Sequence, residues 1–244
     1  MKVSFCNPNY FCYRPAFSSN ATKEYNKDGK PVCTCTFMFR GDCNWQEMTD
    51  YFIRHFKDKD KVNVFQFGSS DGSEAYTKII SLLETKKDVN KFFPIKAFDI
   101  SEQMVNAANS GMINILPDEI KDIPNFYRYF TPTDKKLVLE RDILHNKTYE
   151  VKDILKNKVQ FKKGDMFEIM KNFKDDSNSL LLCRNVLLYF EDDEITELAD
   201  LLAEKLKKGS LFVVSPDDRD LTNIDTKLSN RGFRYIFNGV YRKM

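Results

Sequence analysis

The sequence predicts an α/β protein with a doubly wound, mostly parallel sheet and a C-terminal antiparallel hairpin. Short β-rich runs alternate with stretches of helical periodicity along most of the 244-residue chain. A glycine-containing turn follows the first of these runs. Residues 180–183 are fully apolar, as expected of a strand that is buried on both faces of a parallel sheet.

The first half of the chain contains two predicted strands and three predicted helices. Asn44 is a candidate N-cap for a helix in which Trp45, Met48, Phe52 and Phe56 repeat at helical spacing. Residues 118–157 have mixed patterning and receive no assignment. The other predicted elements are strands at Val62–Phe67 and Ile95–Ile100, a helix at Ser73–Glu84, and a helix from Ser101 that Gly111 stops.

The second half continues the same alternation. We expect one domain over residues 36–244, preceded by an irregular, cysteine-containing arm at residues 1–35 that is rich in turn formers. The predicted elements are strands at Val159–Lys163, Leu180–Cys183 and Leu211–Ser215, a helix at Asp192–Leu206 closed by Gly209, and a hairpin at Gly232–Tyr241.

The composition excludes some classes of partner. The chain has 38 basic and 36 acidic side chains and a net charge of +2, so it has no general attraction to nucleic acid or to an anionic membrane. No apolar run approaches the ~18 residues of a membrane-spanning helix, and the N-terminus lacks the apolar core of a signal peptide. We therefore expect a cytoplasmic protein with no nucleic-acid partner and no membrane insertion.

The cysteines are concentrated near the N-terminus, which raises the question of a zinc site. No C-x2-C pair is present, and the C-x-C of Cys33 and Cys35 is a poor chelate on a strand. Buried thiols are the favoured interpretation, and no metal is expected. The five cysteines before residue 44 are Cys6, Cys12, Cys33, Cys35 and Cys43.

The turn after the first predicted strand is a candidate ligand site. Gly68 and Gly72 permit a tight turn and a close approach to the backbone, and a helix N-terminus follows. Glu74 lies in the first helical turn, where its charge competes with a phosphate and suits a cationic ammonium group, such as the methionyl end of S-adenosylmethionine. An ordinary turn whose glutamate complements the helix dipole explains the segment about equally well.

Two aspartates follow predicted strands. Asp99 ends the second strand, where a carboxylate can accept hydrogen bonds from both ribose hydroxyls. The alternative is a capping role beside Ser101, and together with the glycine turn the ribose role is favoured. Asp165, which follows the third strand, is a weaker candidate for the adenine region because Lys-Gly-Asp is also a common turn.

A family resemblance rests chiefly on residues 183–190. Their sequence, CRNVLLYF, closely resembles the CRNVxxYF signature of the CheR family, the chemotaxis-receptor glutamate methyltransferases. Residues 36–40 resemble the family's TxFFR motif, with Met38 in place of its first Phe. Residues 68–76 resemble its G-C-S-T-G-E-E-P-Y turn, with Glu74 on the second glutamate. Weaker matches at Phe98–Ser101, Tyr129–Phe130, Val159–Phe161 with Asp165, and Gly239–Lys243 extend the resemblance over about residues 36–244.

The resemblance implies a Rossmann-like class I methyltransferase fold that binds S-adenosylmethionine and releases S-adenosylhomocysteine. It implies that Glu74 binds the methionyl ammonium group, Asp99 the ribose and Asp165 the adenine region. From the residues alone, a surface salt bridge for Arg40 and a packed aromatic for Tyr189 are the simpler interpretations. The resemblance instead makes Arg40 and Tyr189 catalytic, and implies cofactor contacts from Gly68, Ser70, Gly72, Glu74, Asp99, Met104, Asp165, Met166, Asn185 and Val186.

The implied reaction fits these residue types. Methyl transfer from a sulfonium is an in-line displacement in which the cofactor supplies the reactive carbon. A glutamate acceptor is ionised near neutral pH, so the reaction requires alignment rather than a strong base. An arginine can orient a carboxylate through two parallel N–H bonds, and a tyrosine hydroxyl can donate another.

The chain also departs from the family pattern. The family usually has a basic N-terminal helical domain that helps engage receptor helices, whereas only about 35 residues precede the motif at 36–40, so we expect that domain to be lacking. Ser73 and Ala75 replace a Glu and a Pro, and residues 215–218 stand where a G-H-S-E segment is frequent. A different protein or small-molecule acceptor, and a non-catalytic cofactor-binding module, therefore remain alternatives to a carboxylate-bearing protein substrate. A nicotinamide-dependent oxidoreductase is disfavoured by Glu74.

Overall fold

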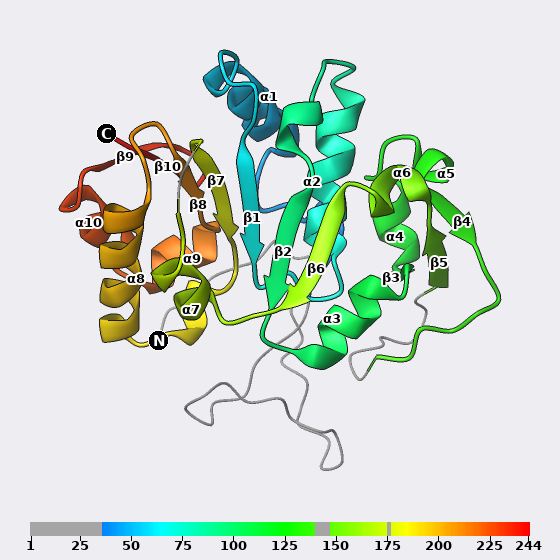
Figure 1. Cartoon of the computed structure of the whole chain (residues 1–244). Helices are drawn as coiled ribbons and strands as arrows, with labels where there is room; N and C mark the ends of the chain where they lie inside the picture. Colours follow the sequence, from blue (N-terminus) through cyan, green and yellow to red (C-terminus); the bar gives the residue numbers. More distant parts are fainter. Residues whose placement is uncertain (1–35, 140–146, 175–176) are drawn as a thin grey trace, which may run out of the picture.

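The computed structural model describes residues 36–139, 147–174 and 177–244 (Figure 1). Its centre is a seven-stranded sheet with the order β6-β2-β1-β7-β8-β10-β9. The first five strands in this order are mutually parallel, β10 runs antiparallel to β8, and β9 runs antiparallel to β10. The strands are β1 Asn63–Phe67, β2 Ile95–Asp99, β6 Val159–Lys163, β7 Ser179–Cys183, β8 Leu211–Val213, β9 Phe233–Phe237 and β10 Val240–Lys243.

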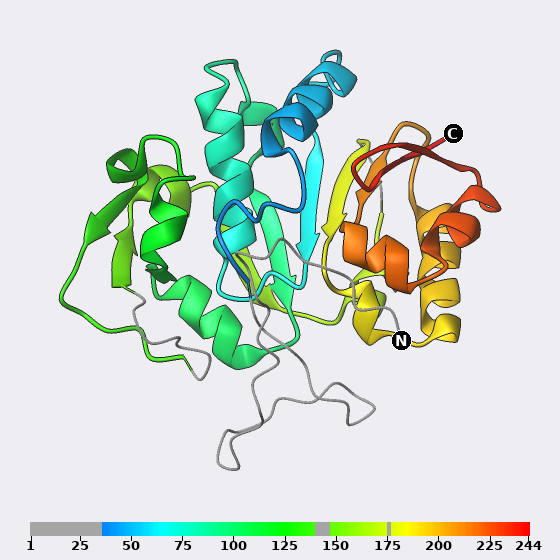
Figure 2. The ribbon, with the colours of Figure 1, turned by 180° about the vertical axis from the view of Figure 1, so that it is seen from behind.

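Helices cover both faces of this sheet (Figures 1 and 2). Successive residues of a strand point to opposite faces. Val64 of β1 accordingly joins a core cluster with helices α1 and α2, whereas Phe65 joins a second cluster with α7, α8 and α10. The helices of this unit are α1 Trp45–His55, α2 Ser73–Glu84, α3 Glu102–Asn109, α7 Met166–Lys171, α8 Asp192–Lys205, α9 Pro216–Leu221 and α10 Ile224–Ser229, with 3-10 turns η1 Asn90–Phe92 and η2 Leu187–Tyr189.

A second, three-stranded antiparallel sheet lies between α3 and β6 in the chain and has the order β3-β5-β4. It lies at one side of the main sheet, beside α2 and β6 (Figure 1). Its apolar side chains, among them Ile113, Tyr149 and Val151, belong to the same core cluster as α1 and α2. Its elements are β3 Met112–Ile115, α4 Pro117–Ile120, α5 Phe126–Tyr129, β4 Phe130–Pro132, β5 Lys147–Val151 and α6 Asp153–Lys156.

The predicted fold class and the main elements are confirmed. All five predicted parallel strands are present, and the helix at Ser73–Glu84 has the expected bounds. Asn44 caps α1 by accepting from the backbone N–H of Glu47, and Ser101 caps α3 by accepting from that of Met104. The predicted C-terminal hairpin is β9–β10.

The small sheet and the short helices α4 to α7, α9 and α10 are not among the sequence predictions. The strands of the small sheet are only three to five residues long, and β3 pairs with β5 across a long stretch of chain. Runs of this length show too few repeats to separate a strand from a buried helical turn. The pairing is therefore decided by tertiary contacts rather than by local periodicity.

Some sequence predictions concern parts outside the described residues, namely the irregular arm at residues 1–35 and the cysteines in it. No helix within the described ranges is both long enough and apolar enough to cross a membrane.

Candidate active site

The glycine turn, Asp99 and the residues after β7 lie at the carboxyl edge of the parallel strands. The chain adds β2 and β6 on one side of β1 and then crosses to add β7 and β8 on the other side. The edge between β1 and β7 is therefore the topological switch point, where open α/β sheets bind ligands. The glycine turn follows β1, and Asn185 and Val186 follow β7.

The two loops at the switch point are in direct contact. Gly68 has a φ of +66°, and a Cβ built on it would lie 2.4 Å from Cγ2 of Val186. Gly72 has a φ of +90° and is the N-cap residue of α2, where a Cβ would lie 2.6 Å from the ring of Phe161. Both glycines are thus required by backbone conformation and by space.

The turn is further held by Asp99, at the end of β2. One carboxylate oxygen of Asp99 accepts from the backbone N–H of Ser70 at 2.6 Å, and the other accepts from that of Ser101 at 2.9 Å. Ser70 itself has a φ of +48°. Asp99 thus holds both the glycine turn and the backbone of Ser101, which is itself the N-cap of α3. A carboxylate oxygen can accept more than one hydrogen bond.

The loop after β7 is held by a residue that the sequence analysis did not propose. The buried carboxylate of Asp218, at the start of α9, accepts from the backbone N–H groups of Asn185 at 2.7 Å and Val186 at 3.0 Å, and from that of Leu188 at 3.3 Å. It also accepts from Ser215 N at 3.0 Å and Oγ at 2.8 Å. Burial raises the pKa of the Asp218 carboxyl, while these hydrogen bonds oppose the rise.

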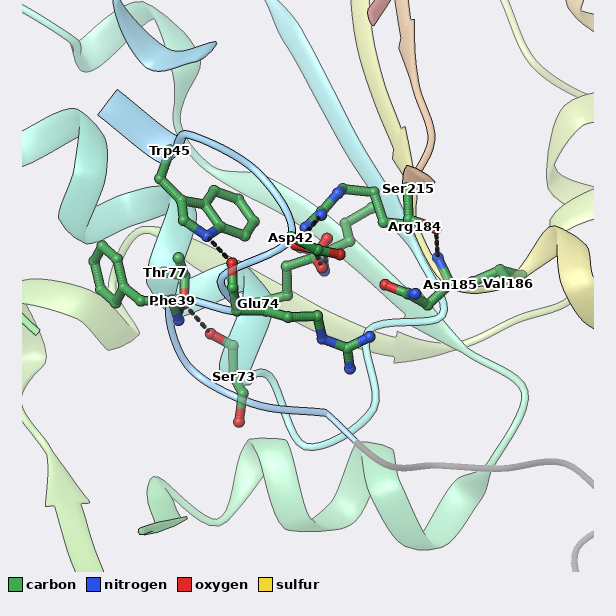
Figure 3. Close-up of polar contacts among 12 residues, drawn as sticks. Phe39, Asp42, Trp45, Ser73, Glu74, Thr77, Arg184, Asn185, Val186 and Ser215 are labelled. Atoms are coloured by element: carbon green, nitrogen blue, oxygen red, sulfur yellow. Dashed lines mark hydrogen bonds and ion pairs between the residues drawn. The ribbon is translucent and has the colours of Figure 1, made fainter. Parts of the chain in front are cut away.

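Arg184 is the second residue that sequence reasoning missed, although it stands inside the CRNV motif. It reaches from the end of β7 toward two acids (Figure 3). Its Nη1 lies 3.0 Å from Oε2 of Glu74, and its Nη2 lies 2.6 Å from Oδ1 of Asp42. An arginine side chain is always charged in proteins, so one that directly follows a fully apolar strand requires a buried counter-charge. This feature of the sequence could have identified Arg184 as part of the site.

The electrostatics of this ion-pair network balance burial against pairing. Burial raises the pKa of Glu74, and the positive charges of Arg184 and Arg40 oppose that rise. Burial lowers the pKa of Arg184, but Glu74, Cys43 and Asp42 more than offset it, so that its pKa rises overall. Because Arg40 acts on Glu74, the TxFFR-like segment contributes positive charge close to the glycine turn.

The segment that carries Arg40 lies against α2 and α4. The backbone N–H of Phe39 donates to Thr77 Oγ1 at 3.0 Å, and that of Met38 donates to Glu119 Oε1 at 2.8 Å. Tyr189 ends the 3-10 turn η2 and is half-buried, as Arg40 is. Arg40 thus lies on the loop that Asp42 ties to Arg184, and Tyr189 lies on the loop whose backbone Asp218 holds.

Three polar atoms near the switch point are buried and have no hydrogen-bond partner among the described residues. They are Oδ1 of Asn185, Oγ of Ser69 and Oε1 of Gln66, on the neighbouring β1 and β7 segments. Buried polar atoms are normally satisfied, so such atoms at one edge fit a polar ligand. With the carboxylates of Glu74 and Asp99, they suit a ligand that carries both an ammonium group and hydroxyl groups.

Comparison with known proteins identifies the family. The family model described as CheR methyltransferase, SAM binding domain, matches residues 34–232. The chain belongs to the CheR methyltransferase family. The sheet order and the antiparallel β10 are those of the Rossmann-like class I methyltransferase fold that the resemblance implies.

Curated relatives of this CheR-family chain are chemotaxis protein methyltransferases. That of Borreliella burgdorferi is 26% identical over 221 residues, covering 85% of this chain and 70% of that protein. That of Vibrio anguillarum is 25% identical over 175 residues, covering 69% of this chain and 58% of that protein. The chain thus spans between 58% and 70% of the length of these two relatives.

Solved structures with a related arrangement include other methyltransferases. The magnesium protoporphyrin IX methyltransferase of Synechocystis PCC 6803 with bound SAM has a TM-score of 0.39 and 15% identity, covering 81% of this chain and 76% of that chain. The precorrin-6y C5,15-methyltransferase of Geobacter metallireducens has a TM-score of 0.41 and 12% identity, covering 80% of this chain and 85% of that chain.

Three residues of the predicted CheR-type cofactor site are placed less directly. Asp165 caps α7 by accepting from the backbone N–H of Glu168 at 3.0 Å. Met104 is buried in a small cluster with α3 neighbours, and Met166 is buried in the cluster on the α8 face. The structure places all three near strand ends but does not join them to the Glu74–Asp99 group.

The two cysteines within the described ranges are free thiols, Cys43 and Cys183. Burial raises the pKa of Cys43 to about 11 and that of Cys183 well above its usual value, so both are poor thiolates at neutral pH. Within the described ranges no three His, Cys, Asp or Glu side chains form a group that could hold a metal ion. The zinc question concerns Cys6, Cys12, Cys33 and Cys35, which lie outside these ranges.

Proposed function

We propose that this chain is an S-adenosylmethionine-dependent methyltransferase that transfers a methyl group to a carboxylate of a protein, in the manner of a glutamate O-methyltransferase. The observation that carries the proposal is the convergence of Glu74, Asp99 and Asn185 at the switch point, where Oδ1 of Asn185 is buried and has no hydrogen-bond partner among the described residues. The names of the curated relatives support a chemoreceptor as the substrate. A cytoplasmic location is part of the same proposal.

The cofactor would be held by residues at the ends of four strands, β1, β2, β6 and β7. Glu74 would bind the methionyl ammonium group through Oε1, which accepts a long hydrogen bond from Gln66 Nε2 at 3.4 Å, because Oε2 is paired more closely with Arg184 at 3.0 Å. Asp99 would accept from the ribose hydroxyls, and Asp165 would lie toward the adenine. Gly68, Ser70 and Gly72 would let the cofactor approach the backbone closely. Val186, Met104 and Met166 would contribute apolar contacts with the cofactor. When bound, S-adenosylmethionine supplies an electrophilic methyl group, and S-adenosylhomocysteine is the product.

The acceptor side of the proposal assigns Arg40 and Tyr189 to the reacting centre. Arg40 would orient the acceptor carboxylate through paired N–H donors, and Tyr189 would donate from its hydroxyl. The acceptor is already ionised near neutral pH, so no residue needs to remove a proton. Alignment of the acceptor oxygen is then the main contribution of these two side chains.

The experiment incubates the protein with S-adenosylmethionine labelled in its methyl group and with the cytoplasmic domain of a chemoreceptor. Transfer to a glutamate gives a methyl ester, which releases labelled methanol in alkali, whereas transfer to nitrogen or carbon gives an alkali-stable product. Alkali-labile label on the receptor domain supports the proposal. Label on small molecules alone would favour the alternative acceptor, and calorimetry that shows no binding of S-adenosylhomocysteine would refute the proposed cofactor.

A further inference from the structure

Trp45, at the start of α1, is the single tryptophan of the sequence and is only 7% exposed. Its indole Nε1–H donates to the backbone carbonyl of Arg40 at 2.9 Å, the contact marked in Figure 3. This hydrogen bond links a buried ring to the residue that the proposed function places at the reacting centre.

Two cations contact the same ring. Nζ of Lys78, one turn along α2 from Glu74, lies 4.9 Å from the centroid of the Trp45 ring, and Cζ of Arg184 lies 4.7 Å from it. Both distances are within the range in which an aromatic face attracts a cation. Tryptophan is the side chain that provides the strongest attraction of this kind.

Lys78 depends on this contact to an unusual degree. Its side chain is fully buried, and Nζ has no hydrogen-bond partner within the described residues. Its other aromatic contact among the described residues is Phe52, whose ring centroid lies 4.7 Å from Nζ. An amine buried without hydrogen bonds is costly, and the two rings offset part of that cost, so Lys78 in turn helps to fix the position of the indole.

Arg184 ties the indole to the cofactor side of the site. The guanidinium that contacts Trp45 is itself paired with Glu74 at 3.0 Å and with Asp42 at 2.6 Å. Asp42 belongs to the same loop as Arg40, so the loop is attached to the network at two points. The Trp45 ring therefore contacts both the ion-pair network, through Arg184, and the backbone of Arg40.

The backbone at Arg40 is held on its other side as well. The preceding residue, Phe39, has a φ of +45°, a conformation that non-glycine residues rarely adopt, and its N–H donates to Thr77 at 3.0 Å. Such a conformation persists only where the surroundings determine it. Two hydrogen bonds therefore fix this segment between α2 and α1. The Phe39 N–H donates to Thr77 of α2, and the Arg40 carbonyl accepts from Trp45 of α1.

We propose that Trp45 is a positioning residue for Arg40: its indole N–H holds the Arg40 carbonyl, and Lys78 and Arg184 hold the indole. This rests on the proposed function, because it assumes that Arg40 orients the acceptor carboxylate. A misplacement of about 1 Å at a reacting centre lowers a rate by about 100-fold, so loss of a single anchoring bond is expected to be visible in kcat.

The test removes the N–H while keeping the ring. Because the chain has one tryptophan, β-(3-benzothienyl)alanine can replace Trp45 alone, with sulfur in place of the N–H group. Trp45→Phe is the encoded counterpart. Tyr51→Phe is the control, because Tyr51 lies on the same helix but contacts His55 and Phe237 rather than the Arg40 segment.

Three quantities are measured on each protein: kcat and KM of methyl transfer, the affinity for S-adenosylhomocysteine by calorimetry, and hydrogen exchange of the amides of residues 38–42. We expect the benzothienyl protein to lose about 10-fold to 100-fold in kcat with unchanged S-adenosylhomocysteine affinity. We expect its exchange at residues 38–42 to rise about tenfold, and the control to match the native protein throughout.

The outcomes separate this inference from the proposed function. Unchanged exchange at residues 38–42 overturns the role of Trp45, whether or not the native protein transfers methyl groups. Equal losses of kcat, S-adenosylhomocysteine affinity and thermal stability also overturn it, because they indicate a purely structural role. If the native protein shows no transfer to any acceptor while the exchange effect appears, the positioning of Arg40 stands and the proposed function fails.

Discussion

Asp218 accepts the backbone N–H of Asn185 at 2.7 Å and thereby connects the loop after β8 to the loop after β7. Asn185 has a φ of +57°, in the left-handed region that asparagine tolerates better than most residues. Its Oδ1 is buried and has no hydrogen-bond partner in the part of the chain that the structure describes. A carboxylate more than thirty positions away in sequence thus helps to determine the conformation of Asn185, which we propose contacts the cofactor.

Replacement of this carboxylate is expected to cost both stability and activity. In Asp218→Asn, an amide nitrogen replaces one acceptor and faces the N–H groups of Asn185 or Val186. We expect the free energy of unfolding to fall by about 3 kcal/mol, measured by urea denaturation. Asp220→Asn, on the exposed side of the same helix, is the control and should change it by less than about 0.5 kcal/mol. Equal stability of the two variants would contradict the capping role.

The contact between Gly68 and Val186 leads to a second prediction, a difference in stability between two glycine-to-alanine variants. Gly68→Ala adds a Cβ at a φ of +66° and 2.4 Å from Val186, so we expect a loss of about 1–3 kcal/mol in unfolding free energy. Gly41→Ala meets no heavy atom within 4 Å and should be neutral or slightly stabilising. Thermal denaturation of the two variants compares them directly, and a Gly68→Ala protein as stable as Gly41→Ala would contradict the close packing.

The burial of Lys78 is expected to make the free energy of unfolding depend on pH. Burial lowers its pKa from 10.5 to about 7, and Arg184 adds to the effect while Cys43 and Glu74 oppose it. Between these values the unfolded chain holds more protons on this lysine than the folded chain does, so stability rises with pH through this window. The cost of burying the ammonium group is therefore largest at and below pH 7.

Lys78→Met removes that titration. We expect the variant to unfold with about 2 kcal/mol more free energy than the native protein near pH 7, and the difference to shrink toward pH 10. Denaturation curves across this range give the measurement. Lys87→Met, at an exposed ion pair with Asp50, is the matched control and should give no such pH-dependent gap. A difference that is constant with pH would show that Lys78 does not titrate there.

The proposed cofactor contacts predict a charge-dependent affinity. Glu74→Gln keeps the shape of the side chain but removes its charge, so binding of the ammonium group should weaken by about 10-fold to 100-fold. Calorimetry with S-adenosylhomocysteine measures this change. Glu197→Gln, at a surface ion pair with Lys171, is the control and should bind as the native protein does. Unchanged affinity in Glu74→Gln would remove this residue from the proposed site.

For the two residues assigned to the acceptor we expect the opposite pattern, a loss of kcat without a loss of cofactor affinity. Arg40→Ala and Tyr189→Phe should lower kcat by about 100-fold or more while leaving S-adenosylhomocysteine affinity within about threefold. A radiometric ester assay and calorimetry on the same preparations provide the two values. Activity that persists in both variants would mean that other groups orient the acceptor.

The elements predicted best are those with a strong local signal. The helix over residues 73–84 and the strand over 159–163 have the bounds that periodicity predicts, because the apolar residues of both elements face the same core cluster. The small sheet escaped prediction because β3, β4 and β5 are short and pair at a distance. Local patterns do not encode which distant run a strand will join.

The site shows the same division. The glycine turn, Asp99 and the CRNVLLYF segment were predictable, because each follows a strand and the ends of parallel strands meet at one edge. Arg184, Asp218 and Trp45 were not proposed, since their roles arise from contacts with residues far away in the chain.

The sequence by itself determined the α/β class, the family and the positions of the two loops at the switch point. It did so because strand periodicity, glycine turns and a specific motif are local properties of the chain. Only the tertiary structure decided which groups share the site. Buried charges must find partners wherever the packing places them, and here that requirement joined Arg184 to Glu74 and Asp42, and Lys78 to the ring of Trp45.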